Sequence, residues 1–443
     1  PDPRLRARFG RGGSGSGSHG TFVVTNPATG AVLAEVADMG AGEVETAVQD
    51  AALALSGWAN TPAKERSRLL MRWNDAVLAN KDYLAQLMTA EQGKPLAEAH
   101  GEVVYGASFL SWFAEEARRI DGDLLEAGPA TQRTVVMRAP VGVCALVTPW
   151  NFPVAMITRK AGAALAAGCT VVIKPAEDTP LSAEAIVALA DDAGIPEGVI
   201  RLVTCSRATV EEVGTELVTH PSVRKVSFTG STGVGKHLET LASSTLKRTS
   251  MELGGNAPFI VFDDADVDEA VKGAMASKFR NSGQTCVCAN RFFVHSAVHD
   301  EFVHKFEAAI NALVVGDGAT DGVTQGPLIN EAAAQKVDDL VRTAVNDGAT
   351  VHSGGRPSDA GPNFYEPTLL TGVTDSMRVA ASEIFGPVAP ILSFEDDRDV
   401  VTRANSTPAG LAAYYYTRDL GRVWRVGEAL HFGMIGVNTG IVS

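Results

Sequence analysis

From Val141 onward, short runs of β-branched residues alternate with amphipathic stretches of helical periodicity. This alternation is typical of parallel α/β sheets, in which each strand is followed by a helix that crosses back over one face. The predicted strands are Val143–Val147, Thr170–Ile173, Val199–Val203 and Val223–Phe228, with helices expected near 153–167, 182–193 and 210–219. We therefore predict a doubly wound nucleotide-binding sheet.

A second α/β unit is predicted after Gly255, because the same alternation resumes there. Its strands are expected at Pro258–Phe262, Val388–Leu392 and Ala412–Tyr416, with a helix at Val267–Arg280. Residues 42–120 have strong helical character, and residues 121–140 have the pattern of an extended hairpin. A chain of 443 residues exceeds the usual size of a single hydrophobic core, so several domains are expected.

These patterns divide the chain into three parts. We predict a nucleotide-binding domain from residues 1–120 and 142–253, a catalytic domain from residues 254–443, and a hairpin from residues 121–141. The first 20 residues, with Arg4, Arg6, Arg8 and Arg11 before a Gly/Ser run, are interpreted as a flexible arm. A remnant of an organelle transit segment and an added Gly/Ser segment are alternatives for this arm.

Composition excludes several classes of function. A formal net charge of −14 argues against nonspecific binding of nucleic acid or anionic membranes. No apolar run approaches the ~20 residues that a membrane-spanning helix needs. The five cysteines, an odd number in a long chain, favour a reducing compartment. His295, His299 and His304 lack a carboxylate or cysteine that would complete a ligand set, so no metal site is predicted.

The loop Phe279–Cys288 holds the strongest candidate for chemistry. Its Cys286 lies in a polar segment after Gly283, where a thiolate near backbone N–H donors becomes a nucleophile for covalent catalysis. A lone cysteine is more often a small buried hydrophobe, so this loop alone is a weak signal.

Three further segments strengthen it: Thr148–Pro153, Met251–Gly255 and Glu383–Pro387. With the cysteine loop, and in this order, they resemble the NAD(P)-dependent aldehyde dehydrogenase superfamily, and the likeness extends from about Val23 to Ser443. The resemblance implies an aldehyde dehydrogenase-like fold in which the hairpin helps subunits associate as a homodimer or homotetramer. Members of the family continue for roughly fifty residues beyond the position of Ser443, with a strand that docks on a neighbouring subunit.

The resemblance assigns catalytic roles to three residues. Cys286 would attack the aldehyde carbonyl and form a thiohemiacetal, and Asn151 with the backbone N–H of Cys286 would bind its oxyanion. Glu252 would be the general base that activates water to release the acid from the thioester. Taken alone, Asn151 could instead cap the following helix, and Glu252 could be an ordinary surface carboxylate.

The predicted cofactor is NAD, with NADP the alternative. The turn Gly230–Gly235, with Gly230, Ser231 and Gly235 in a G-S-T-x-x-G spacing, follows a strand and opens a helix that can receive a pyrophosphate. Lys174 and Glu177 would bond the adenosine ribose, and a carboxylate there repels a 2′-phosphate. The resemblance adds Glu383 and Phe385 at the nicotinamide ribose and ring, and Trp150 beside the dinucleotide.

The predicted substrate is a small aldehyde that carries a carboxylate. Phe152, Met156 and Arg159 share one face of the helix that begins at Pro153, and in the family this face lines the substrate entrance. Arg280 occupies another position that meets substrate in the family. Two guanidinium groups imply a carboxylate at the far end, so succinic semialdehyde is the first choice and glutarate semialdehyde the near neighbour. Arg159 as a surface helix residue is the alternative.

Two further hypotheses concern regulation and class. Cys288 is a redox candidate, because a C-x-C pair can close a strained, labile disulfide with Cys286; a packed thiol without a redox role is the alternative. Acyl transfer to coenzyme A is a second enzyme class on the same fold, and a non-catalytic binding protein is a third possibility. A cytoplasmic location is expected, with the mitochondrial matrix as the alternative.

Overall fold

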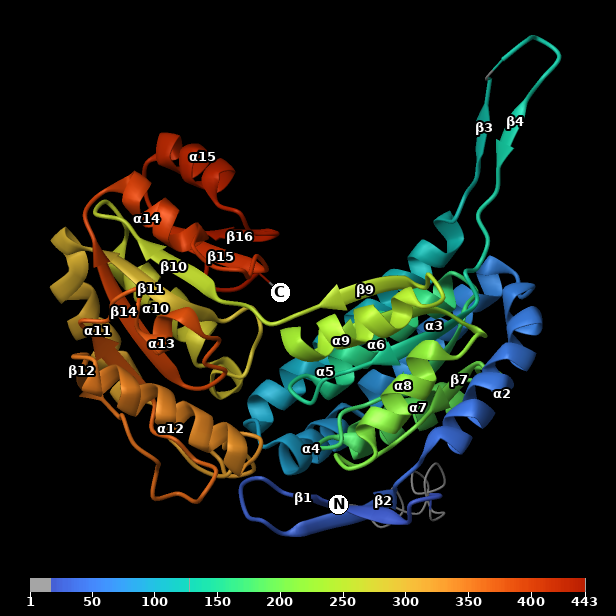
Figure 1. The fold of residues 1–443 in the computed structure, drawn as a ribbon, viewed down its shortest axis with the longest axis horizontal. Coiled ribbons are helices and arrows are strands. Elements are labelled where there is room, and N and C mark those ends of the chain that lie inside the picture. Colours follow the sequence, from blue (N-terminus) through green and yellow to red (C-terminus); the bar gives the residue numbers. More distant parts are fainter. Residues whose placement is uncertain (1–16, 127, 443) are drawn as a thin grey trace. The chain divides into compact units, whose positions relative to one another are not determined.

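The computed structural model describes residues 17–126 and 128–442, so the first 16 residues of the predicted arm lie outside the described part (Figure 1). The chain forms two compact units. The first contains residues 17–25, 32–92 and 99–252, and the second contains residues 26–31, 93–98 and 253–442. Each unit is built around its own parallel β-sheet.

The sheet of the first unit has five parallel strands in the order β7-β6-β5-β8-β9. Its strands are β5 (Val143–Val147), β6 (Thr170–Lys174), β7 (Ile200–Leu202), β8 (Val223–Thr229) and β9 (Arg248–Glu252). Every residue of β5 and β6 is buried, as expected for central strands that helices cover on both faces. The four predicted strands and the doubly wound arrangement are thus confirmed.

The helices of this unit fall into two groups. Four long helices precede the sheet in the sequence: α2 (Ala41–Ala59), α3 (Ala63–Ala79), α4 (Lys81–Gln92) and α5 (Leu96–Glu116). Four others connect its strands: α6 (Pro153–Ala166), α7 (Pro180–Asp192), α8 (Val210–Thr219) and α9 (Thr232–Ser243). Pro153 and Pro180 occupy the first helical position, where the missing N–H costs nothing.

Two antiparallel hairpins complete the first unit. One pairs β1 (Thr21–Thr25) with β2 (Val32–Ala37). The other pairs β3 (Asp123–Leu125) with β4 (Thr134–Val136) within the predicted range 121–140, and it extends away from the sheet of its own unit (Figure 1). Leu124, Val135 and Met137 on the second hairpin are exposed.

The sheet of the second unit has seven strands in the order β12-β13-β14-β11-β10-β15-β16, and only the β12–β13 pair is antiparallel. The strands are β10 (Ala257–Val261), β11 (Ala289–His295), β12 (Thr350–Ser353), β13 (Thr368–Thr371), β14 (Val388–Phe394), β15 (Ala412–Tyr416) and β16 (Met434–Val437). Neighbouring residues on β10 enter different cores, Phe259 on one face and Ile260 on the other. This alternation follows from the two-residue period of a strand.

Six helices pack around that sheet: α10 (Val267–Lys278), α11 (His299–Asn311), α12 (Glu331–Asn346), α13 (Arg378–Ala381), α14 (Asp397–Asn405) and α15 (Leu420–Ala429). The prediction of a helix through Arg280 was wrong by two residues. After Lys278 the chain turns into the short 3₁₀ segment η2 (Arg280–Gly283), in which Asn281 and Ser282 have positive φ. An α-helix cannot continue through left-handed residues.

No helix in residues 17–126 and 128–442 is both long and apolar enough to cross a membrane.

Candidate active site

The predicted nucleophile lies in a constrained loop of the second unit. Cys286 is half-buried, between η2 and the start of β11. Three consecutive residues ahead of it, Asn281, Ser282 and Gly283, have φ values of 52°, 54° and 75°. Two of these three residues are not glycine, so their left-handed backbone conformation is strained. Such a conformation persists only where contacts with the rest of the protein stabilise it.

Hydrogen bonds stabilise this strained segment. The Ser282 hydroxyl donates to the carbonyl of Gly326 (2.9 Å), and the Asn281 N–H donates to Glu98 (2.6 Å). The side chain of Gln284 accepts from the N–H of Ile329 and donates to the carbonyl of Pro327. The segment that precedes Cys286 is therefore fixed before any substrate arrives.

Two glycines bring Glu383 close to the backbone of Cys286. The Gly255 N–H donates to Glu383 Oε1 (2.9 Å), and a Cβ on Gly255 would lie only 2.2 Å from the carbonyl oxygen of Cys286. A Cβ on Gly254 would lie 2.5 Å from Glu383 Oε2. The segment Gly254-Gly255 thus allows a close approach that larger residues would prevent. Phe385 follows with φ of 56°.

Two lysines lie near these groups, and one of them, Lys278, is buried. Lys278 has no exposed surface, and its amine lies 3.8 Å from Cys288 Sγ. Burial lowers the pKa of Lys278 and raises that of Cys288. Burial also raises the pKa of Glu383, while the Gly255 N–H and the charge of Lys336 oppose that rise. The second unit thus gathers Cys286, Cys288 and Glu383.

The other predicted catalytic residues belong to the first unit. Trp150, Asn151 and Phe152 connect β5 to α6, and Asn151 is 5% exposed. The N-cap position of α6 is Phe152, so Asn151 is not the N-cap residue of that helix. Glu252 is the last residue of β9, and its carbonyl accepts from the N–H of Gly230 (3.0 Å).

Helix α6 carries the predicted substrate face. Met156 is buried and Arg159 is half-buried. The guanidinium of Arg159 donates to the hydroxyl of Tyr105 (3.4 Å) and stacks over the ring of Phe109, with 5.1 Å between its central carbon and the ring centroid. Contacts of this kind orient an arginine without neutralising its charge. Arg280, the second predicted arginine, lies on η2 in the second unit.

Lys160 is a residue that sequence reasoning missed. It follows Arg159 on α6, is 8% exposed, and donates to the hydroxyl of Ser227 on β8 (2.9 Å). Burial lowers its pKa to about 8, while attraction to Glu252 opposes that shift. The sequence did contain a signal for this residue, because Lys160 is a charged side chain in a helix that is mostly apolar.

The predicted adenosine site lies at the end of β6. Lys174 is buried and donates to the carbonyl of Pro175 (3.0 Å). Glu177 has a weak ion pair with Arg207, in which 3.7 Å separate Nε from Oε1. Sequence reasoning missed Arg207, because 30 residues separate it from Glu177 in the chain.

Of the helices α6, α7 and α9, only α9 presents an open start. Glu102 of α5 accepts from backbone N–H groups at the start of α6, and Glu91 of α4 accepts from those at the start of α7. Among the described residues, the start of α9 at Gly230-Ser231-Thr232 has the Ser231 hydroxyl as its only side-chain cap, and Ser231 is exposed. The glycine spacing that predicts a pyrophosphate site thus falls on an open helix start, and the site itself stays a prediction.

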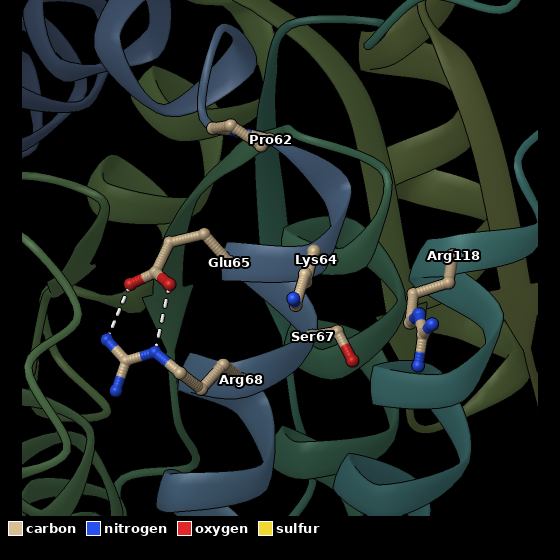
Figure 2. Close-up of a pocket in the computed structure, with 6 residues that line it drawn as sticks. All are labelled: Pro62, Lys64, Glu65, Ser67, Arg68 and Arg118. Atoms are coloured by element: carbon tan, nitrogen blue, oxygen red, sulfur yellow. Dashed lines mark hydrogen bonds and ion pairs between the residues drawn. The ribbon is translucent and has the colours of Figure 1, made fainter.

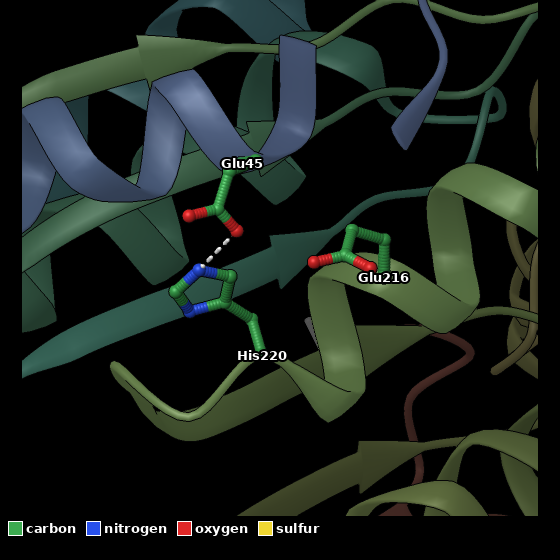
Figure 3. A group of neighbouring side chains, drawn as sticks. All are labelled: Glu45, Glu216 and His220. Carbon is green, nitrogen blue, oxygen red and sulfur yellow. Dashed lines mark hydrogen bonds and ion pairs between the residues drawn. The ribbon is translucent and has the colours of Figure 1, made fainter. Parts of the chain in front are cut away.

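Two other groups do not form a comparable site. Pro62, Lys64, Glu65, Ser67, Arg68 and Arg118 line a surface hollow, where Glu65 pairs with Arg68 (Figure 2). Glu45, Glu216 and His220 lie close enough to suggest a metal site (Figure 3). However, His220 Nδ1 accepts from the Ser222 N–H, so Nε2 carries the proton toward Glu45 and offers no lone pair to a metal.

This chain is similar to known proteins over almost its whole length. A profile of the aldehyde dehydrogenase family matches residues 15–443. The chain is 56% identical over 424 residues to the mitochondrial succinate-semialdehyde dehydrogenase of Rattus norvegicus, covering 96% of this chain and 81% of the relative. It is 53% identical over 423 residues to the glutarate-semialdehyde dehydrogenase of Pseudomonas aeruginosa, covering 96% and 87%.

A solved structure of similar shape is described as an Escherichia coli NADP dependent enzyme. It matches with a TM-score of 0.95 and 53% identity, over 97% of this chain and 89% of that one. The predicted aldehyde dehydrogenase-like α/β fold is thereby confirmed. The extent of these matches, together with the cysteine loop and the open start of α9, shows that this chain belongs to the aldehyde dehydrogenase family.

Proposed function

We propose that this protein oxidises succinic semialdehyde, or a similarly short aldehyde with a terminal carboxylate, to the acid. The observation that carries the proposal is Arg159, which keeps its charge on the α6 face next to Phe152 and Met156. The similar rat and Pseudomonas enzymes are named for two such substrates, which differ by one methylene. Arg280 is the second candidate for the carboxylate.

The magnitude of the charge interaction is sufficient for selection. At an effective dielectric of ~20, one pair of unit charges ~4 Å apart is worth about 4 kcal/mol before desolvation. A bidentate contact between a guanidinium and a carboxylate adds geometric fit. A neutral aldehyde of the same length gains none of this energy, so it should bind much more weakly.

The chemistry proposed for the chain's own residues has two stages. The thiolate of Cys286 adds to the aldehyde carbon, and the side-chain amide of Asn151 with the Cys286 N–H stabilises the oxyanion. Glu252 then takes a proton from water, whose oxygen attacks the thioester and releases the acid and the thiol. Between these stages, the bound nicotinamide supplies the hydride acceptor. The positive charge of Lys160 attracts Glu252.

The cofactor of the family is a nicotinamide dinucleotide, and we propose NAD as the preferred form here. The start of α9 would hold the pyrophosphate, Lys174 and Glu177 the adenosine ribose, and Glu383 with Phe385 the nicotinamide end, with Trp150 beside the dinucleotide. The charge of Glu177 opposes a 2′-phosphate. Arg207 lies beside Glu177 and would weaken that opposition, so NADP should also support turnover.

The exposed apolar hairpin β3–β4 is proposed to bind a second copy of the chain. Leu124, Val135 and Met137 are costly to leave in water and are typical of an interface. Light scattering should then give a dimer or tetramer, and Val135→Lys with Met137→Lys should shift the protein toward monomer. A monomeric parent protein would contradict this proposal.

The function is tested by measuring NADH formation with succinic semialdehyde, with butyraldehyde, and with the variant Cys286→Ala. Turnover of the acid aldehyde, at least tenfold slower turnover of butyraldehyde at low concentration, and none in the variant would support the proposal. Equal turnover of both aldehydes would refute the carboxylate selection. Turnover by Cys286→Ala would refute the covalent chemistry.

A further inference from the structure

The backbone at the start of α6 is held by a carboxylate that belongs to another helix. Glu102 of α5 is 3% exposed, and its Oε1 accepts hydrogen bonds from the N–H groups of Val154 (3.0 Å) and Ala155 (3.2 Å). The N-cap residue Phe152 offers no side-chain cap. Because the first N–H groups of a helix have no partner within it, Glu102 satisfies donors that the helix itself leaves open.

Helix α5 contacts α6 at further points on the same side. One turn after Glu102, a Cβ on Gly106 would lie 2.9 Å from Val154 Cγ1 and 3.3 Å from the Cα of Ala155. Tyr105 and Phe109 orient Arg159, the next functional side chain along α6. The start of α6 therefore has little freedom to move relative to α5.

The contacts that fix the start of α6 lie next to the proposed oxyanion donor in the sequence. Asn151 lies three residues before Val154, in the short connection between β5 and α6. The end of β5 is fixed by its pairing with β6 and β8, and the start of α6 is fixed by Glu102. An oxyanion donor must be placed to within about half an ångström, and its position is set by the residues that support it.

We propose that Glu102 is a positioning residue for aldehyde oxidation, which fixes the first turn of α6 and thereby places the amide of Asn151. The proposal rests on the function proposed above. Glu102 itself has no part in the bond changes. Losing it should lower the rate of thiohemiacetal formation and hydride release, with a smaller effect on cofactor binding.

The chain offers a matched control in Glu91. This residue is 1% exposed and belongs to α4, and it accepts from the N–H groups of Leu181 and Ser182 at the start of α7. The arrangement is similar, with a buried glutamate at a helix start in the same unit, although Glu91 uses both carboxylate oxygens and also accepts from the Ser182 hydroxyl. None of the residues proposed for bond making or for substrate binding lies on α7.

The experiment compares Glu102→Met, Glu102→Gln and Glu91→Met. Methionine keeps the side-chain volume and removes the acceptor, whereas glutamine keeps an Oε1 that can accept the same two bonds. We expect Glu102→Met to lower kcat, and the rate of the first NADH burst, by about tenfold or more. Glu102→Gln should recover most of this rate, and Glu91→Met should keep kcat within about twofold despite a similar fall in Tm.

A double variant shows whether Glu102 acts through Asn151. If it does, Glu102→Met should lower kcat by less than about threefold in an Asn151→Ala background, because the amide to be placed is gone. The full tenfold loss in that background would overturn the proposal. So would equal losses of kcat in Glu102→Met and Glu91→Met.

The failure of this inference is distinguishable from failure of the proposed function. A parent protein that oxidises none of the carboxylate aldehydes refutes the proposed function, and the role of Glu102 falls with it. If the parent protein is active and Glu102→Met has the same kcat, the positioning role is refuted and the proposed function is not. If Glu102→Met does not fold, Glu102→Ala, which also removes the acceptor, is compared in the parent and Asn151→Ala backgrounds, and equal losses in both backgrounds overturn the proposal.

Discussion

The amine of Lys160 donates a hydrogen bond of 2.9 Å to the hydroxyl of Ser227, which lies in the first unit near the end of β8, three residues before Gly230. This lysine is nearly enclosed by protein, so burial lowers its pKa to about 8, while Glu252 opposes the shift. At pH 7 most of the lysine is still charged. Above about pH 9 it is almost wholly neutral.

This titration predicts a pH-dependent effect of Lys160→Met. Removing the positive charge abolishes the attraction between Lys160 and Glu252, the proposed base, wherever the parent lysine is charged. We expect a two- to tenfold loss of kcat near pH 6 and convergence with the parent above about pH 9, where the parent lysine is neutral. Lys160→Arg, which retains the charge, is the control. A loss of the same size at every pH would show that Lys160 acts through packing.

Arg159→Ala should raise KM for succinic semialdehyde by about 10- to 100-fold, because a charge pair with the substrate carboxylate is lost. KM for butyraldehyde should change by less than about threefold. Tyr105→Phe is the matched control, since it removes the hydroxyl that accepts from Arg159 but leaves the charge in place. Steady-state kinetics with both aldehydes make the comparison. Equal changes in both KM values would place Arg159 outside the substrate site.

The pair of Glu177 and Arg207 predicts a change in cofactor preference. Glu177→Gln removes the charge that opposes a 2′-phosphate, so the ratio of kcat/KM for NADP to that for NAD should rise by about 10-fold or more. Arg207→Ala should lower the same ratio, because Glu177 then acts unopposed. The two ratios are measured with one aldehyde at saturation. Movement of both ratios in the same direction would contradict this account of the adenosine site.

Cys288 predicts a specific response to oxidant. Hydrogen peroxide would oxidise the two thiols of Cys286 and Cys288 to one disulfide, with two molecules of water as the other product. All five cysteines are present as thiols in the structure, and Cys288 is buried beside Lys278. Peroxide should therefore inactivate the enzyme reversibly, and Cys288→Ala should lose recovery by dithiothreitol. Recovery that is unchanged in Cys288→Ala would leave Cys288 as a packing residue.

Local pattern was sufficient to predict much of this fold. The strands β5, β6 and β8 were predicted to within a residue because two buried faces require continuous runs of β-branched and apolar residues. The cysteine loop was recognisable for a different reason, since its polar residues and glycine stand between a helical and an extended pattern. Both signals are contained in windows of ten residues or fewer.

Pairing between distant segments was not predictable in this way. Glu102 and Val154 are separated by 52 residues, and Glu91 and Ser182 by 91, so neither contact leaves a periodic signal. The left-handed conformations of Asn281 and Ser282 could not be predicted from residue propensities either, because hydrogen bonds to distant segments stabilise them. The roles assigned to Cys286, Asn151 and Glu252 stay predictions, which the variants above test.

A last prediction concerns the pH dependence of stability, which Glu91 should dominate. Burial raises the pKa of Glu91 to about 8, although the hydrogen bonds from Leu181 and Ser182 lower it. Burial also raises the pKa of the neighbouring Glu184 to about 7. The ordinary pKa of both groups is 4.5, so the folded state holds protons that the unfolded state has released. Their contribution to stability is thus complete below about pH 4.5 and is lost as pH rises toward 8.

We therefore expect the free energy of unfolding to fall by about 1 to 3 kcal/mol between pH 5 and pH 8 from these groups. Glu91→Gln cannot titrate, so its unfolding free energy should be lower at pH 5 and should fall less steeply toward pH 8. Glu184→Gln should flatten the curve near pH 7, and the double variant should be the flattest. Urea denaturation at five pH values measures these slopes. A Glu91→Gln slope equal to that of the parent would mean that Glu91 is ionised throughout, held as a carboxylate by the start of α7.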